Sequence, residues 1–163
     1  CSVGGAEVIA MIVSDIMTPR PVTVHMDDTI EHARRMFEIH GFHHLLVTDG
    51  RKLVGVLADR ALLRHISPFV GKMAERPQDL QTLQKRLHQA MTRQPVTVDA
   101  QTSVADAAHT MVCNKVNCLP VLDAGKKVVG IVTWRDLVKA WVPNVDECPF
   151  PQPAESDEPA KAE

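Results

Sequence analysis

Part of this chain occurs twice, and this duplication is the feature that most restricts its fold. Residues 17–24 read MTPRPVTV, and residues 91–98 repeat the pattern as MTRQPVTV. The similarity continues to residues 55–57 (GVL), which correspond to residues 130–132 (GIV). Two copies of one supersecondary unit are expected to bury a shared face and to leave clefts at the seam, where small ligands commonly bind.

The second copy shows its element order most clearly. Ser103 and Asp106 form a predicted capping box before a helix. The apolar face of that helix consists of Val104, Ala107, Ala108, Met111 and Val112. Two apolar runs of strand length, residues 119–122 and 128–132, flank a turn at residues 123–125, and a second helix is expected over residues 134–142. The unit is therefore strand, helix, strand, strand, helix, which places the chain in the α/β (α+β) class.

The first copy has the same order. Its first helix is expected to be capped by Asp28 and to end at Gly41. Asp49-Gly50 is a strong hairpin signal between two further strands. Between the copies, an amphipathic connecting helix is predicted after Pro77. Its apolar positions would be Leu80, Leu83, Leu87 and Met91, and three methionines on apolar faces are expected to fill the cores: Met36, Met91 and Met111.

These patterns divide the chain into five parts. They are an extension at residues 1–12, a first repeat at 13–67, a helical linker at 68–86, a second repeat at 87–142, and a disordered tail rich in proline and acidic residues at 143–163. The tail composition cannot build a core. Two half-size repeats that share one core fit the length of 163 residues better than two independent domains.

Composition disfavours several classes of function. The formal net charge is −2 and no long basic run occurs, so a nucleic-acid partner is not expected. No apolar stretch approaches the roughly 20 residues of a spanning helix, and we expect a soluble, cytoplasmic protein. The absence of a Walker loop, a nucleophile with its base, or a spaced carboxylate pair argues against an enzyme.

The cysteines are expected to be reduced thiols rather than a disulfide framework. They are Cys1, Cys113, Cys118 and Cys148. A zinc site could combine Cys113, Cys118 and His109, but the C-x4-C spacing is wider than in most structural sites and no second pair exists. We therefore expect no metal.

The order of motifs resembles the cystathionine-β-synthase (CBS) domain, here as the tandem pair called a Bateman module. The resemblance rests on both MTxxPVTV segments, on residues 119–123 (LPVLD) and on residues 130–136 (GIVTWRD), and it covers about residues 13–142. It implies two pseudo-symmetric repeats packed through their sheets and a regulatory fold without chemistry of its own. It also implies a cleft for an adenine-containing ligand (AMP, ADP, ATP or S-adenosylmethionine), no required cofactor, a homodimer, and a regulated protein partner.

The resemblance assigns the main ligand site to the second repeat. The Asp136 carboxylate could hold a ribose diol, while Thr133 and Arg135 could bind a sugar or phosphate oxygen, helped by free N–H groups at the helix start. The adenine would lie against Thr92, Val96, Asn117, Cys118, Leu119 and Pro120. Pro120 lacks an N–H donor, so its strand is expected at a sheet edge or open to the cleft.

The first repeat departs from the pattern, because Ala58 and Ala61 stand where the second repeat has Thr133 and Asp136. We therefore expect a weakened or empty site there. Three alternatives stay open. Thr133 and Asp136 could be helix caps only, in a structural dimerisation module with a vestigial site. Trp134 could be a dimer contact or a lid over the cleft. The cluster of His40, His43 and His44 could be a pH sensor or a metal ligand set, although ordinary surface histidines are favoured.

Overall fold

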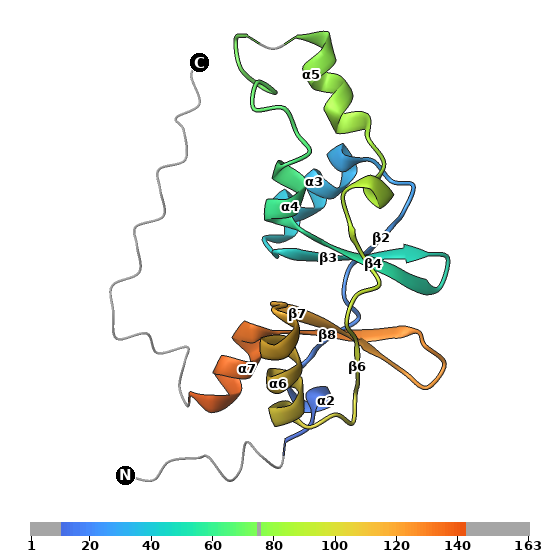
Figure 1. Cartoon of the computed structure of the whole chain (residues 1–163), viewed down its shortest axis with the longest axis vertical. Helices are drawn as coiled ribbons and strands as arrows, with labels where there is room; N and C mark the ends of the chain where they lie inside the picture. Colours follow the sequence, from blue (N-terminus) through green and yellow to red (C-terminus); the bar gives the residue numbers. More distant parts are fainter. Residues whose placement is uncertain (1–10, 75, 143–163) are drawn as a thin grey trace.

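The computed structural model describes residues 11–74 and 76–142, in which two similar halves are stacked along the long axis (Figure 1). The predicted tail and nearly all of the extension lie outside these residues. The first copy contains α2 (Val13–Ile16), β1 (Thr18–Pro19), β2 (Thr23–His25), α3 (Ile30–His40), β3 (His44–Asp49), β4 (Lys52–Ala58) and α4 (Asp59–Leu63). The linker contains α5 (Pro77–Gln81) and the 3-10 turn η1 (Thr82–Gln84), and a second 3-10 turn, η2 (Leu87–Gln89), follows at the start of the second repeat. The second copy contains β5 (Thr92–Arg93), β6 (Val98–Asp99), α6 (Val104–Asn114), β7 (Cys118–Leu122), β8 (Val128–Thr133) and α7 (Trp134–Trp141). The predicted element order and fold class are confirmed.

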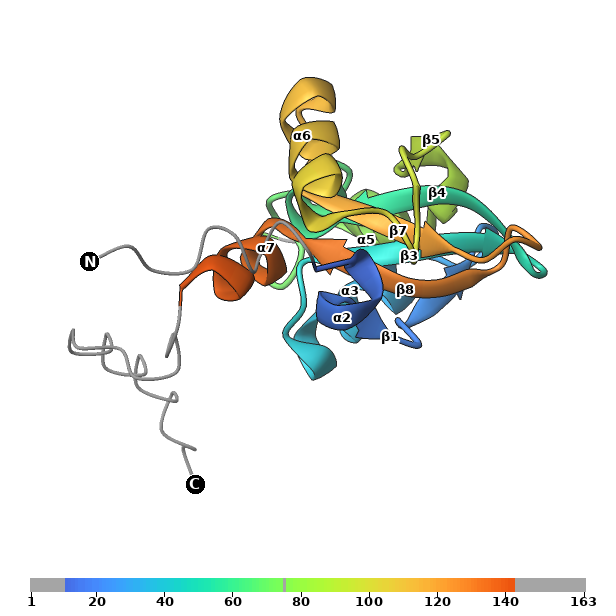
Figure 2. The ribbon, with the colours of Figure 1, turned by 90° about the horizontal axis from the view of Figure 1, so that it is seen from below.

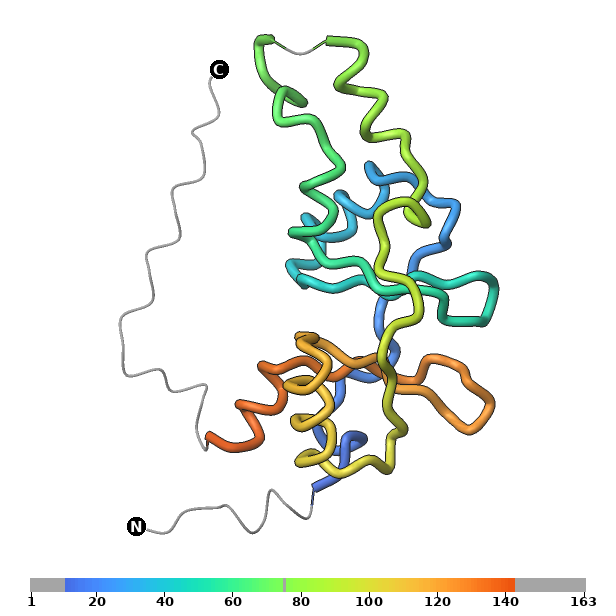
Figure 3. The backbone as a smooth tube through the Cα atoms, viewed as in Figure 1, coloured from blue at the N-terminus to red at the C-terminus, as the bar shows by residue number. Residues whose placement is uncertain are grey.

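The two copies exchange their first strands. One sheet has the order β2-β3-β4-β5 and the other β1-β8-β7-β6, so each sheet contains a short strand from the other copy. β5 pairs antiparallel with β4, and β1 pairs antiparallel with β8. The tube in Figure 3 shows the chain crossing twice between the halves. The copies are therefore tied together by backbone hydrogen bonds as well as by side-chain packing.

Each crossing passes close to a glycine. A Cβ added to Gly55 would lie 2.6 Å from Met91 Sδ and 2.9 Å from the Thr92 carbonyl oxygen. A Cβ added to Gly130 would collide with Met17 Sδ and would lie 3.2 Å from the Thr18 carbonyl oxygen. The glycine that begins each of the repeated segments 55–57 and 130–132 thus leaves room for the strand from the other copy.

Each half has its own hydrophobic core, and a third cluster of buried side chains lies between the two sheets. Helix α3 buries Ile30 and Ala33 in the first core, and α6 buries Val104, Ala107 and Met111 in the second. Met36 and Met91 pack against the first core, so all three methionines fill cores as predicted. Between the sheets lie Leu46, Cys118 and Ile131, with Leu53, Val56 and Val128 packed around them. This cluster confirms that the repeats pack through their sheets.

The two sheets are stacked so that the equivalent ends of their strands lie at the same side of the molecule (Figure 1). The turns of the β3–β4 and β7–β8 hairpins project at one side of the molecule, whereas α4 and α7 lie at the other side (Figures 1 and 2). Both hairpins were predicted, and Gly50 adopts φ 59° in the turn of the first. The two strand-to-helix junctions, Ala58–Asp59 and Thr133–Trp134, are consequently close to the same seam.

The start of α3 differs by one residue from the prediction. Thr29 is its N-cap, and its Oγ1 accepts a hydrogen bond from the His32 N–H at 3.2 Å. Asp28 instead accepts from the His25 N–H at 2.7 Å, which closes the turn before the helix. The predicted end at Gly41 is confirmed, because this residue adopts φ 65°.

The predicted continuous linker helix is wrong. Only residues Pro77–Gln81 form an α-helix, and two 3-10 turns follow. The Leu87 N–H donates to the Asp28 carbonyl, and the Lys85 carbonyl accepts from the Ile30 N–H, both at 2.9 Å. These bonds to the first repeat replace helical bonds, while Leu83 and Leu87 keep the burial that produced the helical pattern.

The expectation of an edge strand at Pro120 is also corrected. β7 lies between β8 and β6, and Pro120 is fully buried opposite Ile131. The proline is accommodated because the β6 pairing involves only Val121 and Leu122 of β7. The missing N–H at Pro120 therefore removes no bond of the β6–β7 ladder.

Candidate functional site

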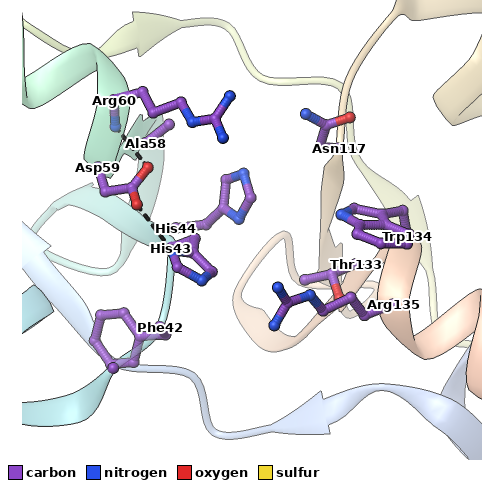
Figure 4. A pocket seen from close by; sticks show the side chains of 11 residues that line it. Phe42, His43, His44, Ala58, Asp59, Arg60, Asn117, Thr133, Trp134 and Arg135 are labelled. Atoms are coloured by element: carbon purple, nitrogen blue, oxygen red, sulfur yellow. Dashed lines mark hydrogen bonds and ion pairs between the residues drawn. The ribbon is translucent and has the colours of Figure 1, made fainter. Parts of the chain in front are cut away.

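The seam between the sheets opens into a cavity of about 480 Å³, which we call the large seam cavity. It lies where β4 leads into α4 and β8 leads into α7, and Figure 4 shows side chains from both copies around it. Its lining residues are Gly41, Phe42, His43, His44, Ala58, Asp59, Arg60, Asn117, Thr133, Trp134 and Arg135. Its volume lies within the range of about 300–1,000 Å³ that is usual for small-molecule sites.

A second hollow of about 230 Å³, the small seam cavity, shares several of these walls. Its lining residues are Thr18, Arg20, Pro21, Val22, Phe42, His43, His44, Ile131, Thr133 and Asp136. Because Phe42, His43, His44 and Thr133 border both hollows, the two form neighbouring parts of one cleft. We call the two together the seam cleft.

Thr133 and Asp136 are held by each other at the mouth of α7. Asp136 Oδ2 accepts hydrogen bonds from the Thr133 N–H and from the Thr133 hydroxyl, each at 2.7 Å. Both residues are half-buried. Within residues 11–74 and 76–142, no hydrogen bond or ion pair involves Asp136 Oδ1. The carboxylate therefore caps the helix with one oxygen, and its other oxygen remains an available acceptor within the described residues.

The helix start offers fewer free N–H groups than the sequence suggested. The Thr133 N–H is taken by Asp136, and the Trp134 N–H donates to the Asn117 carbonyl at 3.1 Å. The Thr133 hydroxyl likewise donates its hydrogen bond to Asp136. Toward a ligand, its oxygen can therefore act only as an acceptor. Positive charge in the cleft comes instead from arginine side chains.

The first copy contributes charged groups at its junction. Ala58 and Ala61 have no polar side-chain atom, as the sequence indicated, but Asp59 and Arg60 line the large seam cavity. Asp59 Oδ2 lies 2.8 Å from His43 Nδ1. Desolvation opposes ionisation of Asp59, but the hydrogen bond with His43, with smaller contributions from the Arg60 N–H and nearby imidazoles, lowers its pKa below the ordinary value.

His44 is the more buried of the two cleft histidines. Burial lowers its pKa, the Asp59 charge acts in the opposite direction, and His43 lowers it further. His44 is therefore neutral at pH 7 in the ligand-free cleft. His40, the third histidine of the sequence cluster, stacks on Phe42 with ring centroids 5.2 Å apart.

Of the predicted ligand residues, Asn117, Thr133, Arg135 and Asp136 line the seam cleft. The other predicted adenine-contacting residues lie elsewhere. Thr92 pairs with Val56 in the first sheet, Val96 and Leu119 pack in the second core, Cys118 lies between the sheets, and Pro120 is buried in β7. Burial raises the pKa of Cys118 to about 12, so its thiol stays protonated at neutral pH.

The residues that do accompany Asp136 come largely from the first copy. Thr18, Pro21 and Val22 are the counterparts of Thr92, Pro95 and Val96 in the duplicated segment. The strand exchange puts this first-copy segment beside β8, where Thr18 pairs with Ile131. The duplication was the available signal, but it did not say which copy of the segment faces which helix.

Comparison with known families agrees with this architecture. The sequence model described as CBS domain matches residues 13–68 and again residues 86–143. The chain belongs to the CBS domain family. It contains two CBS domains in tandem, as in a Bateman module, and solved CBS pairs share its fold.

Among curated proteins, a CBS domain-containing protein of Dictyostelium discoideum is 31% identical over 145 residues, which is 85% of this chain and 97% of that protein. Other relatives are longer. The chain spans 27% of one and 23% of another, an inosine-5'-monophosphate dehydrogenase of Korarchaeum cryptofilum. CBS pairs thus occur in this family both as nearly whole proteins and as parts of larger ones.

Two solved CBS pairs were determined with adenine-containing ligands. CBSX2 in complex with AMP has a TM-score of 0.65 and 30% identity, with 80% of this chain and 95% of that chain covered. The CBS domain pair of protein MJ0100, in complex with 5'-methylthioadenosine and S-adenosyl-L-methionine, has a TM-score of 0.67 and 26% identity at the same coverage. The fold therefore binds adenine-containing ligands in related proteins.

Two further findings concern only the described part of the chain. None of its helices has the length and apolar character needed to cross a bilayer. Nor does it contain a cluster of three or more histidine, cysteine or acidic side chains suited to a metal ion. Of the residues considered for zinc, Cys113 and His109 lie on the exposed face of α6, with Cys113 Sγ 3.3 Å from His109 Nε2. Cys118, in contrast, is buried in β7.

Proposed function

We propose that this CBS pair is a regulatory module that binds an adenine-containing ligand in the seam cleft, with its main site at the second repeat. The observation that carries the proposal is the position of Asp136. Its Oδ1 has no partner within the described residues, it lines the small seam cavity beside Thr133, and carboxylates suit the vicinal diol of a ribose. AMP, ADP, ATP and S-adenosylmethionine are the candidate ligands.

The bound ligand would act on the arrangement of the two repeats. Ligand that contacts both repeats would favour one arrangement of the halves, and a protein partner could sense this change. We propose a cytoplasmic homodimer that needs no cofactor and performs no catalysis. The regulated partner would be another polypeptide or another part of a longer chain.

The alternative is a structural dimerisation module with a vestigial site. It is favoured by the capping bonds of Asp136, because a helix cap needs no ligand. It is also favoured by Ala58 and Ala61, which cannot bind a sugar or a phosphate.

A thermal-shift titration with AMP, ADP, ATP and S-adenosylmethionine separates the two functions. A ligand at 100 times its Kd should stabilise the protein by about 2.7 kcal/mol. Asp136→Ala should abolish this stabilisation. The matched control is Asp106→Ala, because Asp106 caps α6 through the Ser103 hydroxyl (2.7 Å) but lines neither seam cavity.

Both variants lose a cap and should be destabilised by about 1 kcal/mol without ligand. Only Asp136→Ala should lose the response to ligand. No shift with any of the four compounds at millimolar concentration would reject the sensor function and leave the structural one. An equal response in both variants would reject the assignment of Asp136.

A further inference from the structure

The wall that the first copy contributes to the cleft carries two titratable side chains at positions where the second copy has an amide and a thiol. His43 and His44, at the start of β3, correspond to Asn117 and Cys118 at the start of β7. Figure 4 shows the guanidinium groups of Arg60 and Arg135 reaching into the large seam cavity from opposite walls, with the two imidazoles between them. This arrangement suits a phosphate-bearing ligand, because arginine binds phosphate through paired N–H groups.

The two imidazoles are not equivalent before ligand binds. His43 already has an anionic partner, Asp59, at 2.8 Å, and its side chain is 54% exposed. His44 is more buried, and no hydrogen bond or ion pair to its ring is found in the described part of the chain. The Asp59 charge raises the pKa of His44 but does not offset the effect of burial, so the neutral imidazole is favoured.

We propose that binding of a phosphate-bearing ligand in the large seam cavity is coupled to proton uptake by the His43 and His44 pair, so that the module responds to pH as well as to ligand. The proposal rests on the function proposed above and specifies the regulation of the same site. A phosphate placed between Arg60 and Arg135 would add negative charge beside the His44 imidazole, which has no bonded anion within the described residues.

The charges around the pair allow the sign to be worked out. The ionisable groups that face it are Asp59 and Arg60 from α4, Arg135 and Asp136 from α7, and Arg20 from the turn after β1. Three of these five groups are cations, and they oppose protonation in the free protein. A bound dianion reverses this balance, which raises the pKa of His44 in the complex above its pKa in the free protein.

Ligand affinity should therefore increase as pH falls through the pKa values of the complex, and should level off below those of the free protein. Uptake of one proton gives at most about a tenfold change in Kd per pH unit. The phosphate itself protonates with a pKa near 6, which reduces its charge and weakens binding at low pH, so this effect opposes that of the histidine and is smallest well above pH 6.

The test is calorimetric titration of the full chain with AMP and with adenosine between pH 8.0 and 6.5 at constant ionic strength. Titrations at pH 7.2 in two buffers of different ionisation enthalpy give the number of protons taken up. We expect Kd for AMP to fall by about three- to tenfold across this range, with net proton uptake, and Kd for adenosine to stay constant.

The His43→Asn, His44→Asn double variant should bind AMP without this pH dependence, whereas His32→Asn, on the exposed face of α3, should keep it. The number of protons taken up on AMP binding is measured on the wild-type protein. It therefore tests the proposal even if the double variant does not fold. Binding of AMP with neither pH dependence nor proton uptake would overturn the inference but leave the proposed function standing. Equal pH dependence for adenosine would overturn it too. Absence of binding by both compounds would refute the proposed function itself.

Discussion

At the scale of single residues, the contrast between Asp136 and Ala61 determines how the two repeats differ. Asp136 occupies the third position of α7, where its carboxylate holds the Thr133 N–H and hydroxyl. Ala61 occupies the equivalent position of α4, whose N-cap Ala58 makes no side-chain bond. The second junction thus has a side-chain pair that bonds the start of its helix, and the first junction lacks this pair.

Ala58→Thr together with Ala61→Asp should reproduce the second junction in the first repeat. The new cap should stabilise the protein by about 1 kcal/mol, measured as the free energy of unfolding in urea. If the first junction then faces a competent pocket, calorimetry should show a second equivalent of bound ligand. Ala61→Asp alone is the control for the effect of charge. A stabilised variant with unchanged stoichiometry would show that the first repeat lacks more than these two side chains.

At the scale of elements, the strand exchange depends on the two glycines that face it. Both Gly55 and Gly130 lie under a crossing strand, but their neighbours differ in how easily they can move. At Gly130 the closest atom belongs to the flexible Met17 side chain, and the nearest backbone atom is 3.2 Å away. At Gly55 the Thr92 carbonyl oxygen, a backbone atom, lies within 2.9 Å of an added Cβ.

Gly55→Ala should therefore destabilise the protein more than Gly130→Ala, with both losses in the range of about 1–3 kcal/mol that overpacking causes. Gly125→Ala is the control, since the nearest atoms there belong to the Asp123 side chain in an exposed turn. Urea unfolding of the three variants measures the order. A larger loss for Gly130→Ala would mean that the exchanged β1 strand cannot shift with Met17.

At the scale of the whole molecule, α6 and α7 present an apolar surface. A groove of about 450 Å³ between them is lined by Met111, Val112, Val116, Leu137 and Val138, among others, and Trp134 borders both this groove and the large seam cavity. Val112 is 76% exposed and Trp141 is 62% exposed. Apolar side chains gathered in this way often mark a contact with another protein chain.

We expect this surface to form the homodimer contact. Val112→Glu should reduce the mass measured by light scattering from that of two chains to that of one, because it places a charge in an apolar interface. Phe69→Glu, at an exposed linker residue away from α6 and α7, should leave the dimer intact. A wild-type protein that is monomeric at high concentration would contradict the expectation, and Trp134 would then be free to act at the cleft alone.

The sequence by itself determined the two units, their element order, the hairpin turns, the divergence at Ala58 and Ala61, and the place of Thr133 and Asp136 at the start of a helix. These features depend on residues a few positions apart, where periodicity, capping and turn chemistry act.

The tertiary structure alone decided that the linker breaks into 3-10 turns against the first repeat. It also decided that Thr18, Pro21 and Val22, rather than Thr92 and Val96, lie beside Asp136, and that His43 and His44 join the same cleft. Both copies of the duplicated segment have nearly the same local pattern, so only the long-range pairing of β1 with β8 and of β5 with β4 could distinguish them.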